Sequence, residues 1–229
     1  MHSSEIKILS TGCHELDLLL GGGLVPGEIL LIYGERGSGK TTFVFQTLLN
    51  AAFKGLKSIL FSTEGYASLR RLKNMVSSSW AEISDRILVS TVKEFQEQDS
   101  IIENLELILP HDVALVAFDS ITSCYRVALK EKENNIILNK MLNRELAIIK
   151  DLSIRRLLAT VLTSDVTSPP DDKELQPVAS QILTYWCDKI ARLDRLQGDI
   201  RRAVVIKPSP VKEHILRLGS GGLTGISGA

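Results

Sequence analysis

The chain has 229 residues, a length within the range of one α/β domain. Hydrophobic residues make up 44% and charged residues 24% of the sequence, which excludes a disordered chain. The 27 Lys and Arg residues balance the 27 Asp and Glu residues, so a surface for nucleic acid would have to be a local patch.

The first residues lack an apolar signal segment, and no apolar run approaches the roughly 18 residues of a membrane span. The three cysteines, Cys13, Cys124 and Cys187, have no metal-ligand spacing. We interpret them as small apolar residues, and we expect a cytoplasmic protein without membrane association.

Short apolar runs alternate with amphipathic stretches along most of the chain. Buried strands are expected at residues 28–33, 58–62, 86–89, 113–118 and 156–162. Helices are expected at residues 41–53, 69–76, 99–109 and 136–149. Strands separated by helices of this length indicate right-handed crossovers and a mostly parallel sheet, flanked by helices on both faces.

The pattern changes after Pro177. Residues 183–194, 201–207 and 213–218 have the pattern of successive short strands, which we interpret as an antiparallel C-terminal extension of the same sheet. Residues 1–229 are therefore expected to form one α/β domain. The connector 164–176 is long enough to be functional, and residues 219–229 predict a flexible tail.

The segment GERGSGKT, residues 34–41, is a complete G-x-x-x-x-G-K-T pattern between a predicted strand and a predicted helix. Its glycines let backbone N–H groups point at phosphate oxygens, so we call it the P-loop. Lys40 would meet the β- and γ-phosphates, and the Thr41 hydroxyl would bind Mg²⁺. The alternative is a glycine-rich turn that only starts a helix. The predicted phosphate-binding residues are Gly34, Glu35, Arg36, Gly37, Ser38, Gly39, Lys40, Thr41 and Thr42.

Two carboxylates follow predicted strands. Asp119 ends the apolar run 113–118, where a rigidly held carboxylate can reach Mg²⁺. Glu64 follows the run 58–62 and could orient or deprotonate an attacking water, although capping of a surface turn is an equal alternative. The chain has no arginine-rich lid after the site, which disfavours a small-molecule kinase.

Several segments together resemble the RecA/RadA recombinase superfamily, and within it the short archaeal paralogues of RadA. The entry ILSTGCHELDLLLGGG (8–23) runs into the P-loop, and TEGYASLRR (63–71) and FDSITS (118–123) are similar to the family's strand ends. LTYW (183–186) and KIARL (189–193) are also similar. The resemblance extends to about Leu218.

The resemblance implies a RecA-like fold and a weak ATPase of DNA recombination and repair, with ATP and Mg²⁺ as cofactors. It matches Glu64 with the water-activating glutamate and Arg71 with an arginine near the adenine. It matches the segment after Thr122 and the connector 164–176 with the two DNA-binding loops. DNA and a recombinase are the implied partners. The alternatives are a KaiC-like signalling ATPase that does not bind DNA, and a non-catalytic accessory subunit.

Asp165 departs from the family pattern, which commonly ends this strand with Thr-Asn-Gln, where the amide senses the γ-phosphate. An ionised carboxylate is repelled by phosphates, so we add Asp165 to the catalytic set and expect slow hydrolysis. The alternative is that Asp165 pairs with a cation such as Arg192 or Lys189. The first ten residues leave no room for the N-terminal domain and polymerisation segment of recombinases, so long filaments are not expected, whereas a homodimer is compatible with the sequence.

The C-terminal part of the chain is locally basic. On alternating strands, Arg201, Arg202 and Lys207 could share one face and contact DNA phosphates. The alternative is a solvated sheet edge that discourages strand pairing. The family resemblance favours the DNA-binding interpretation.

Overall fold

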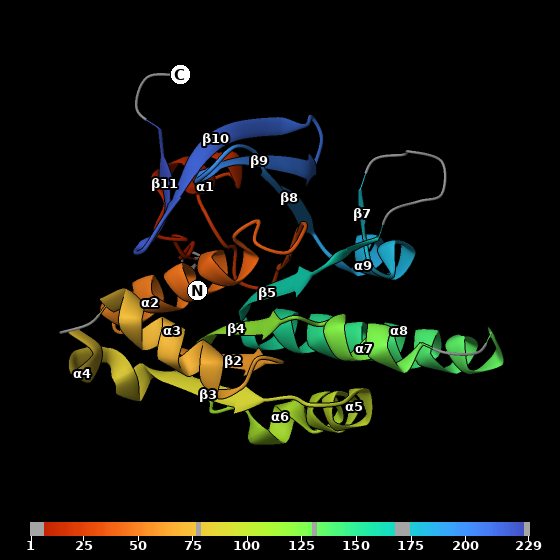
Figure 1. Cartoon of the computed structure of the whole chain (residues 1–229). Coiled ribbons are helices and arrows are strands. Elements are labelled where there is room, and N and C mark those ends of the chain that lie inside the picture. Colours follow the sequence, from red (N-terminus) through yellow and green to blue (C-terminus); the bar gives the residue numbers. More distant parts are fainter. Residues whose placement is uncertain (1–6, 77–78, 130–131, 168–174, 227–229) are drawn as a thin grey trace, which may run out of the picture.

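The computed structural model describes residues 7–76, 79–129, 132–167 and 175–226 (Figure 1). One nine-stranded sheet runs through it in the order β11-β10-β9-β8-β1-β5-β4-β2-β3. Its strands are β1 (Ile29–Tyr33), β2 (Lys57–Ser62), β3 (Ile87–Thr91), β4 (Val113–Asp119), β5 (Ala159–Ser164), β8 (Lys189–Arg195), β9 (Ile200–Lys207), β10 (Lys212–Gly219) and β11 (Gly222–Gly225).

The sheet is parallel from β8 to β3 and antiparallel from β8 to β11. This arrangement confirms the predicted mostly parallel sheet with an antiparallel C-terminal extension. β1 lies between β5 and β8, and all five of its residues are buried. The carboxyl ends of β1, β2, β4 and β5 therefore meet at one edge of the sheet, where parallel α/β folds bind ligands.

Helices cover both faces of the sheet (Figure 1). The helices are α1 (His14–Leu19), α2 (Lys40–Phe53), α3 (Tyr66–Val76), α4 (Trp80–Ile83), the 3-10 helix η2 (Ser84–Arg86), α5 (Phe95–Glu103), α6 (Leu105–Ile108), α7 (Ser123–Ala128), α8 (Lys132–Arg156) and α9 (Ser180–Trp186). Helices α1 to α4 pack with the core that contains Leu30 and Ile32. Helices α5 to α9 pack with the core that contains Ile29 and Leu31, so alternate residues of β1 belong to opposite cores.

Two expected element boundaries are wrong. The expected strand 156–162 begins too early, because α8 runs through Arg156 and β5 begins only at Ala159. Arg156 instead donates hydrogen bonds to the carbonyls of Leu109 and Pro110, and Leu157 turns the chain with a φ of 50°. The expected helix 99–109 is two helices, α5 and α6.

Residues 183–186 form the end of α9 rather than the start of a strand. Their aromatic composition favours a strand, but Leu183 is fully buried, whereas Tyr185 is 75% exposed. The indole of Trp186 donates to Asn143 on α8 over 2.8 Å, which holds α9 against that helix. Tertiary packing therefore outweighs the local preference.

The flexible tail expected from residue 219 is also a wrong prediction as far as residue 226. β10 continues to Gly219 and pairs with β11. The side-chain amide of Gln46 on α2 donates to the carbonyl of Leu223 and accepts from its N–H, over 3.0 and 2.8 Å. These two bonds fix an otherwise glycine-rich edge strand. Residues 227–229 lie outside the described residues.

The long connector has structured ends. β6 (Val166–Thr167) pairs antiparallel with β7 (Gln176–Pro177), directly after Asp165. Residues 168–174, which carry its prolines and acidic side chains, lie outside the described residues. No helix in the described part of the chain is long and apolar enough to cross a membrane.

Candidate nucleotide-binding site

The P-loop connects β1 to α2 and borders a cleft of about 720 Å³ at the carboxyl edge of the sheet. Most of the predicted site residues line this cleft. They are Glu35, Arg36, Gly37, Gly39, Lys40, Thr41, Thr42, Glu64, Arg71, Asp119 and Asp165. The structure thus brings together residues that are far apart in the sequence, as their positions after parallel strands predict.

Gly34 and Ser38 are the two predicted P-loop residues that do not line the cleft, because both are buried behind it. A Cβ atom on Gly34 would lie only 2.2 Å from the carbonyl oxygen of Leu193 on β8. Glycine is therefore required at position 34 by the close approach of another strand. The Ser38 side chain is fully buried and its Oγ has no hydrogen-bond partner.

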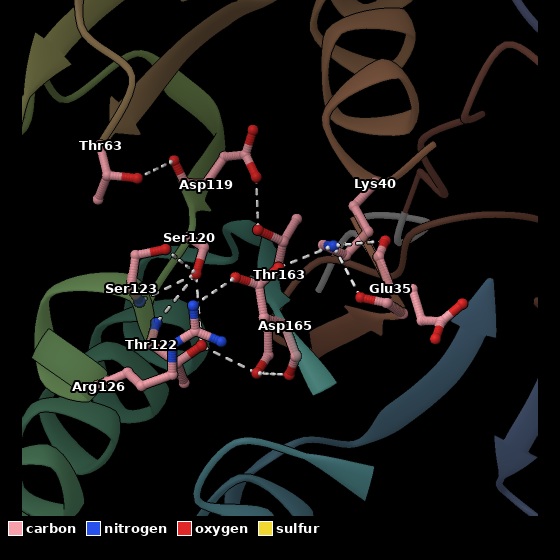
Figure 2. Close-up of polar contacts among 12 residues, drawn as sticks. Glu35, Lys40, Thr63, Asp119, Ser120, Thr122, Ser123, Arg126, Thr163 and Asp165 are labelled. Carbon is pink, nitrogen blue, oxygen red and sulfur yellow. Dashed lines mark hydrogen bonds and ion pairs between the residues drawn. The ribbon is translucent and has the colours of Figure 1, made fainter. Parts of the chain in front are cut away.

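The ammonium group of Lys40 has three acceptors. It donates to the carbonyls of Gly34 and Glu35, over 2.8 and 3.1 Å, and lies 3.0 Å from a carboxylate oxygen of Asp165 (Figure 2). An ammonium group has three donors, so its hydrogen-bonding capacity is filled. A phosphate that binds Lys40 must therefore displace one of these acceptors, and Asp165 is the side chain among them.

The alternative pairing of Asp165 with Arg192 or Lys189 is wrong. Arg192 lies 2.9 Å from Asp194, and Lys189 lies 3.3 Å from Glu28. Asp165 instead lies between Lys40 and Arg126, whose guanidinium is 3.9 Å from its other carboxylate oxygen (Figure 2).

Asp119 is held rigidly at the base of the cleft. Its side chain accepts a hydrogen bond from the Thr163 hydroxyl, and its other oxygen, Oδ2, is buried without a hydrogen-bond partner. Burial raises the pKa of Asp119. The hydrogen bond from Thr163 and the nearby Thr41 hydroxyl act in the other direction and lower this pKa. A cation beside Oδ2 would favour the ionised form.

Glu64 follows β2 and is close enough to Asp119 for its charge to raise the pKa of that carboxyl group. Its own carboxylate lies 3.1 Å from the guanidinium of Arg71, which also lies over the ring of Phe45, 5.4 Å from the ring centroid. Both charged side chains are about half exposed, so the pair is easily exchanged for other partners.

The turn after β4 adds residues that the sequence analysis did not identify. Ser120 accepts hydrogen bonds from the N–H groups of Thr122 and Ser123, over 3.2 and 3.1 Å, and thereby starts α7 at the cleft (Figure 2). Ser123 and Arg126, three residues apart and so on one face of α7, both line the cleft. In the sequence, these two residues could have been identified from their three-residue spacing in the segment that follows Asp119.

A profile of the Rad51 family matches residues 2–225 of the chain. The chain belongs to the Rad51 family. The match covers both halves of the sheet, and it bears out the resemblance carried by the P-loop and the segments that follow β2 and β4.

The Rad51-family chain is also similar to proteins named DNA repair and recombination protein RadB. The RadB of Methanosphaera stadtmanae is 34% identical over 213 residues, which are 91% of this chain and 90% of that protein. The RadB of Thermococcus kodakarensis is 34% identical over 203 residues, or 87% and 89% of the two chains. A crystal structure of the RadB recombinase matches with a TM-score of 0.80 and 30% identity, over 96% of this chain and all of that one, 100%.

The three candidate DNA-binding cations of this Rad51-family chain differ in exposure, and only Arg201 is buried. Arg201 is only 5% exposed, so its prediction as a DNA contact is corrected. Arg202 donates over 2.9 Å to Asp194 on the neighbouring strand. Lys207 donates to the carbonyls of Thr184 and Cys187, over 3.1 and 2.7 Å. Arg202 and Lys207 are partly exposed, so DNA contact by these two side chains stays a prediction.

Proposed function

We propose that this chain binds ATP with Mg²⁺ in the cleft, hydrolyses it slowly, and acts with DNA in recombination and repair as a recombinase paralogue or mediator. The observation that supports this best is the convergence of Lys40, Asp119 and Glu64 on one cleft at the carboxyl edge of the sheet. Family membership supports an ATPase, and the names of the RadB relatives support recombination and repair.

The residues of the cleft fit Mg²⁺. Oδ2 of Asp119 is a buried carboxylate oxygen without a partner, and the Thr41 hydroxyl lies beside the same carboxyl group. Among the described residues, no group of three or more His, Cys, Asp or Glu could hold a metal ion. Thr41 and Asp119 would therefore hold Mg²⁺ together with phosphate oxygens and water, and Mg²⁺ would neutralise charge on the phosphates.

The remaining steps belong to side chains of the chain itself. Lys40, at the start of α2, would bind the β- and γ-phosphates as a compact cation. Glu64 would accept a proton from the attacking water, once Arg71 has left its carboxylate. Arg71 would then be free to contact the adenine ring or the phosphates of the nucleotide.

Asp165 supports slow turnover. Its carboxylate lies 3.0 Å from the ammonium of Lys40, so it competes with phosphate for the same cation. It also cannot donate a hydrogen bond to the γ-phosphate, as an amide at this position would. Both effects oppose the bound triphosphate and its transition state.

DNA association is proposed to involve Arg126. This side chain is 56% exposed and lies on α7, in the segment that resembles the first DNA-binding loop. The guanidinium of Arg126 lies 3.9 Å from Asp165, whose other carboxylate oxygen lies beside Lys40. The carboxylate of Asp165 therefore lies between the proposed nucleotide site and the proposed DNA contact. The predicted homodimer is retained as part of the proposal, and light scattering of the purified protein would test it.

The test is hydrolysis of ATP by the purified protein with Mg²⁺, with and without DNA, at two salt concentrations. The proposal expects slow turnover that is lost in Glu64→Gln, and salt-dependent DNA binding. Turnover without any DNA binding would favour the KaiC-like alternative. Nucleotide binding with no turnover above that of Glu64→Gln would favour a non-catalytic accessory subunit.

A further inference from the structure

Arg201 is a cation in an unusual position. It lies on β9, is only 5% exposed, and has no carboxylate within ion-pair distance in the described part of the chain. Burial accordingly lowers its pKa. Burying a charge is unfavourable unless polar groups replace the lost water. The hydrogen-bond acceptors of the Arg201 guanidinium therefore indicate which parts of the protein this residue holds together.

Three backbone carbonyls surround its guanidinium. Nη1 donates to the carbonyl of Gly198, in the turn between β8 and β9, and to that of Ile200, the first residue of β9, over 2.9 and 2.8 Å. Nη2 donates to the carbonyl of Gly37 over 3.1 Å. Gly37 lies in the P-loop, 164 residues away in the sequence. One rigid fork of donors thus joins the β8–β9 turn to the loop that forms the proposed phosphate site.

The same antiparallel strands contact the P-loop at two further positions. Gly34 lies against the carbonyl of Leu193 on β8, and a Cβ atom on Gly39 would lie 3.6 Å from Leu218 on β10. These contacts are steric and apolar. Arg201 provides the polar contact between them, at Gly37, which is exposed to the cleft. The antiparallel extension therefore forms the rear support of the P-loop.

We propose that Arg201 is a positioning residue for the proposed nucleotide site: it fixes the carbonyl of Gly37 and so holds the P-loop in a form ready for phosphate. The inference rests on the proposed function, because it assigns a role within that site. Without the guanidinium, the carbonyl of Gly37 loses the donor that ties it to β9. The remaining bonds of the loop end at its first residues, because the Ser38 N–H and the Lys40 ammonium donate to the carbonyls of Glu35 and Gly34. Ordering the loop would then reduce the free energy gained from binding phosphate.

The test compares nucleotide affinity in four single variants by calorimetry with Mg-ATP and Mg-ADP. Arg201→Gln removes the charge and the fork, and Arg201→Lys keeps the charge but cannot reach three carbonyls. Arg217→Gln is the matched control, because Arg217 is an exposed arginine of β10 that pairs with Asp199 in the same turn. Gly198→Ala strains a φ of 60° in open space and so destabilises the turn without removing the guanidinium.

We expect Arg201→Gln to weaken both nucleotides about tenfold, with Arg201→Lys between it and the wild type. Arg217→Gln should stay within about twofold of the wild type. Gly198→Ala strains the turn that carries one of the three carbonyls, so its loss of affinity should be smaller than that of Arg201→Gln. Amide hydrogen exchange of residues 34–40 without nucleotide should be faster in both Arg201 variants than in Arg217→Gln. If Arg201→Gln does not fold, Arg201→Lys and its hydrogen exchange decide the matter.

Wild-type affinity in the folded Arg201 variants would overturn the inference, as would an equal loss of affinity in Arg217→Gln. Failure of the proposed function is distinguishable from both outcomes. In that case the wild type itself would bind Mg-ATP no better than Lys40→Ala.

Discussion

The parallel and antiparallel halves of the sheet use their charged residues in opposite ways. At the carboxyl edge of β1, β2, β4 and β5, charged side chains converge on an open cleft. On β8 and β9, Arg201 and Arg202 satisfy groups within the protein, although the sequence suggested a surface for DNA. Parallel strand ends place polar residues at a shared edge, whereas a cation on an antiparallel strand can face a core, a neighbouring strand or solvent.

On β9, the charge of Arg201 supports the cleft from behind. Gly34 touches β8 and Gly37 accepts from Arg201, so the P-loop is supported by strands of the antiparallel half. Leu218 on β10 is the residue of these strands that lines the cleft itself. Substitutions in the two halves should then differ in kind. Those in the cleft should change nucleotide binding and turnover directly.

The largest expected effect is that of Lys40→Ala. It removes the P-loop ammonium group that would bind the β- and γ-phosphates, and ATP affinity should fall by about a hundredfold or more, because charge-assisted contacts to phosphate are strong. Equilibrium dialysis with labelled ATP measures this. Lys57→Ala is the control, since Lys57 is an exposed residue that pairs with Asp112 over 2.6 Å. Equal affinity in the two variants would refute the assignment of the cleft.

A smaller but opposite effect is expected for Asp165→Asn. The amide restores a donor near the γ-phosphate and removes a repulsive charge, so turnover should rise about tenfold. Steady-state ATPase assays check it, with Glu64→Gln as the inactive reference. Asp165→Gln should behave in the same direction. Flat or reduced turnover in variants that fold and bind ATP would mean that Asp165 does not restrain the reaction.

Behind the cleft, Glu145 on α8 is fully buried, and its carboxyl group accepts from Gln98 over 2.7 Å. Gln98 also donates to the carbonyl of Ile121 over 3.1 Å, two residues after Asp119. Burial, with a smaller contribution from the charge of Asp99, raises the pKa of Glu145 to about 8, although the hydrogen bond from Gln98 and the charge of Arg144 act to lower it. The folded protein therefore keeps a proton on Glu145 that the unfolded chain releases near pH 4.5.

Stability should accordingly fall as the pH rises from about 5 to about 8, because over this interval the folded state binds more protons than the unfolded state. Glu145→Gln removes this dependence, so its stability relative to the wild type should improve by about 3–4 kcal/mol across the interval. Urea unfolding at several pH values measures the difference. Parallel pH profiles for the two proteins would show that Glu145 is ionised in the folded state.

The smallest expected effect concerns DNA. Arg126→Gln should lower DNA affinity for all sequences and reduce the slope of log affinity against log salt by about one unit. Arg202→Gln should leave the slope unchanged, because its guanidinium already pairs with Asp194. The opposite result would return DNA binding to the antiparallel strands. Titrations at several salt concentrations decide between the two halves.

The sequence predicted the residues that line the cleft better than the contacts that support the P-loop from behind, for a physical reason. The residues after β1 and β4 follow from motif spacing, because a parallel strand delivers its last side chain to a fixed edge. The contacts of Arg201 with Gly37 and of Asp165 with Lys40 join distant segments, and neither spacing nor composition encodes them. For the same reason the docking of β11 on Gln46 could not be read from a glycine-rich tail.

The most direct test of the account is calorimetry of Mg-ATP binding to the wild type and to Asp165→Asn, with Lys40→Ala as the reference for lost binding. In the wild type, phosphate must displace the carboxylate that lies 3.0 Å from Lys40. The account predicts that Asp165→Asn binds Mg-ATP about tenfold more tightly than the wild type. Unchanged or weaker binding by the folded variant would contradict it.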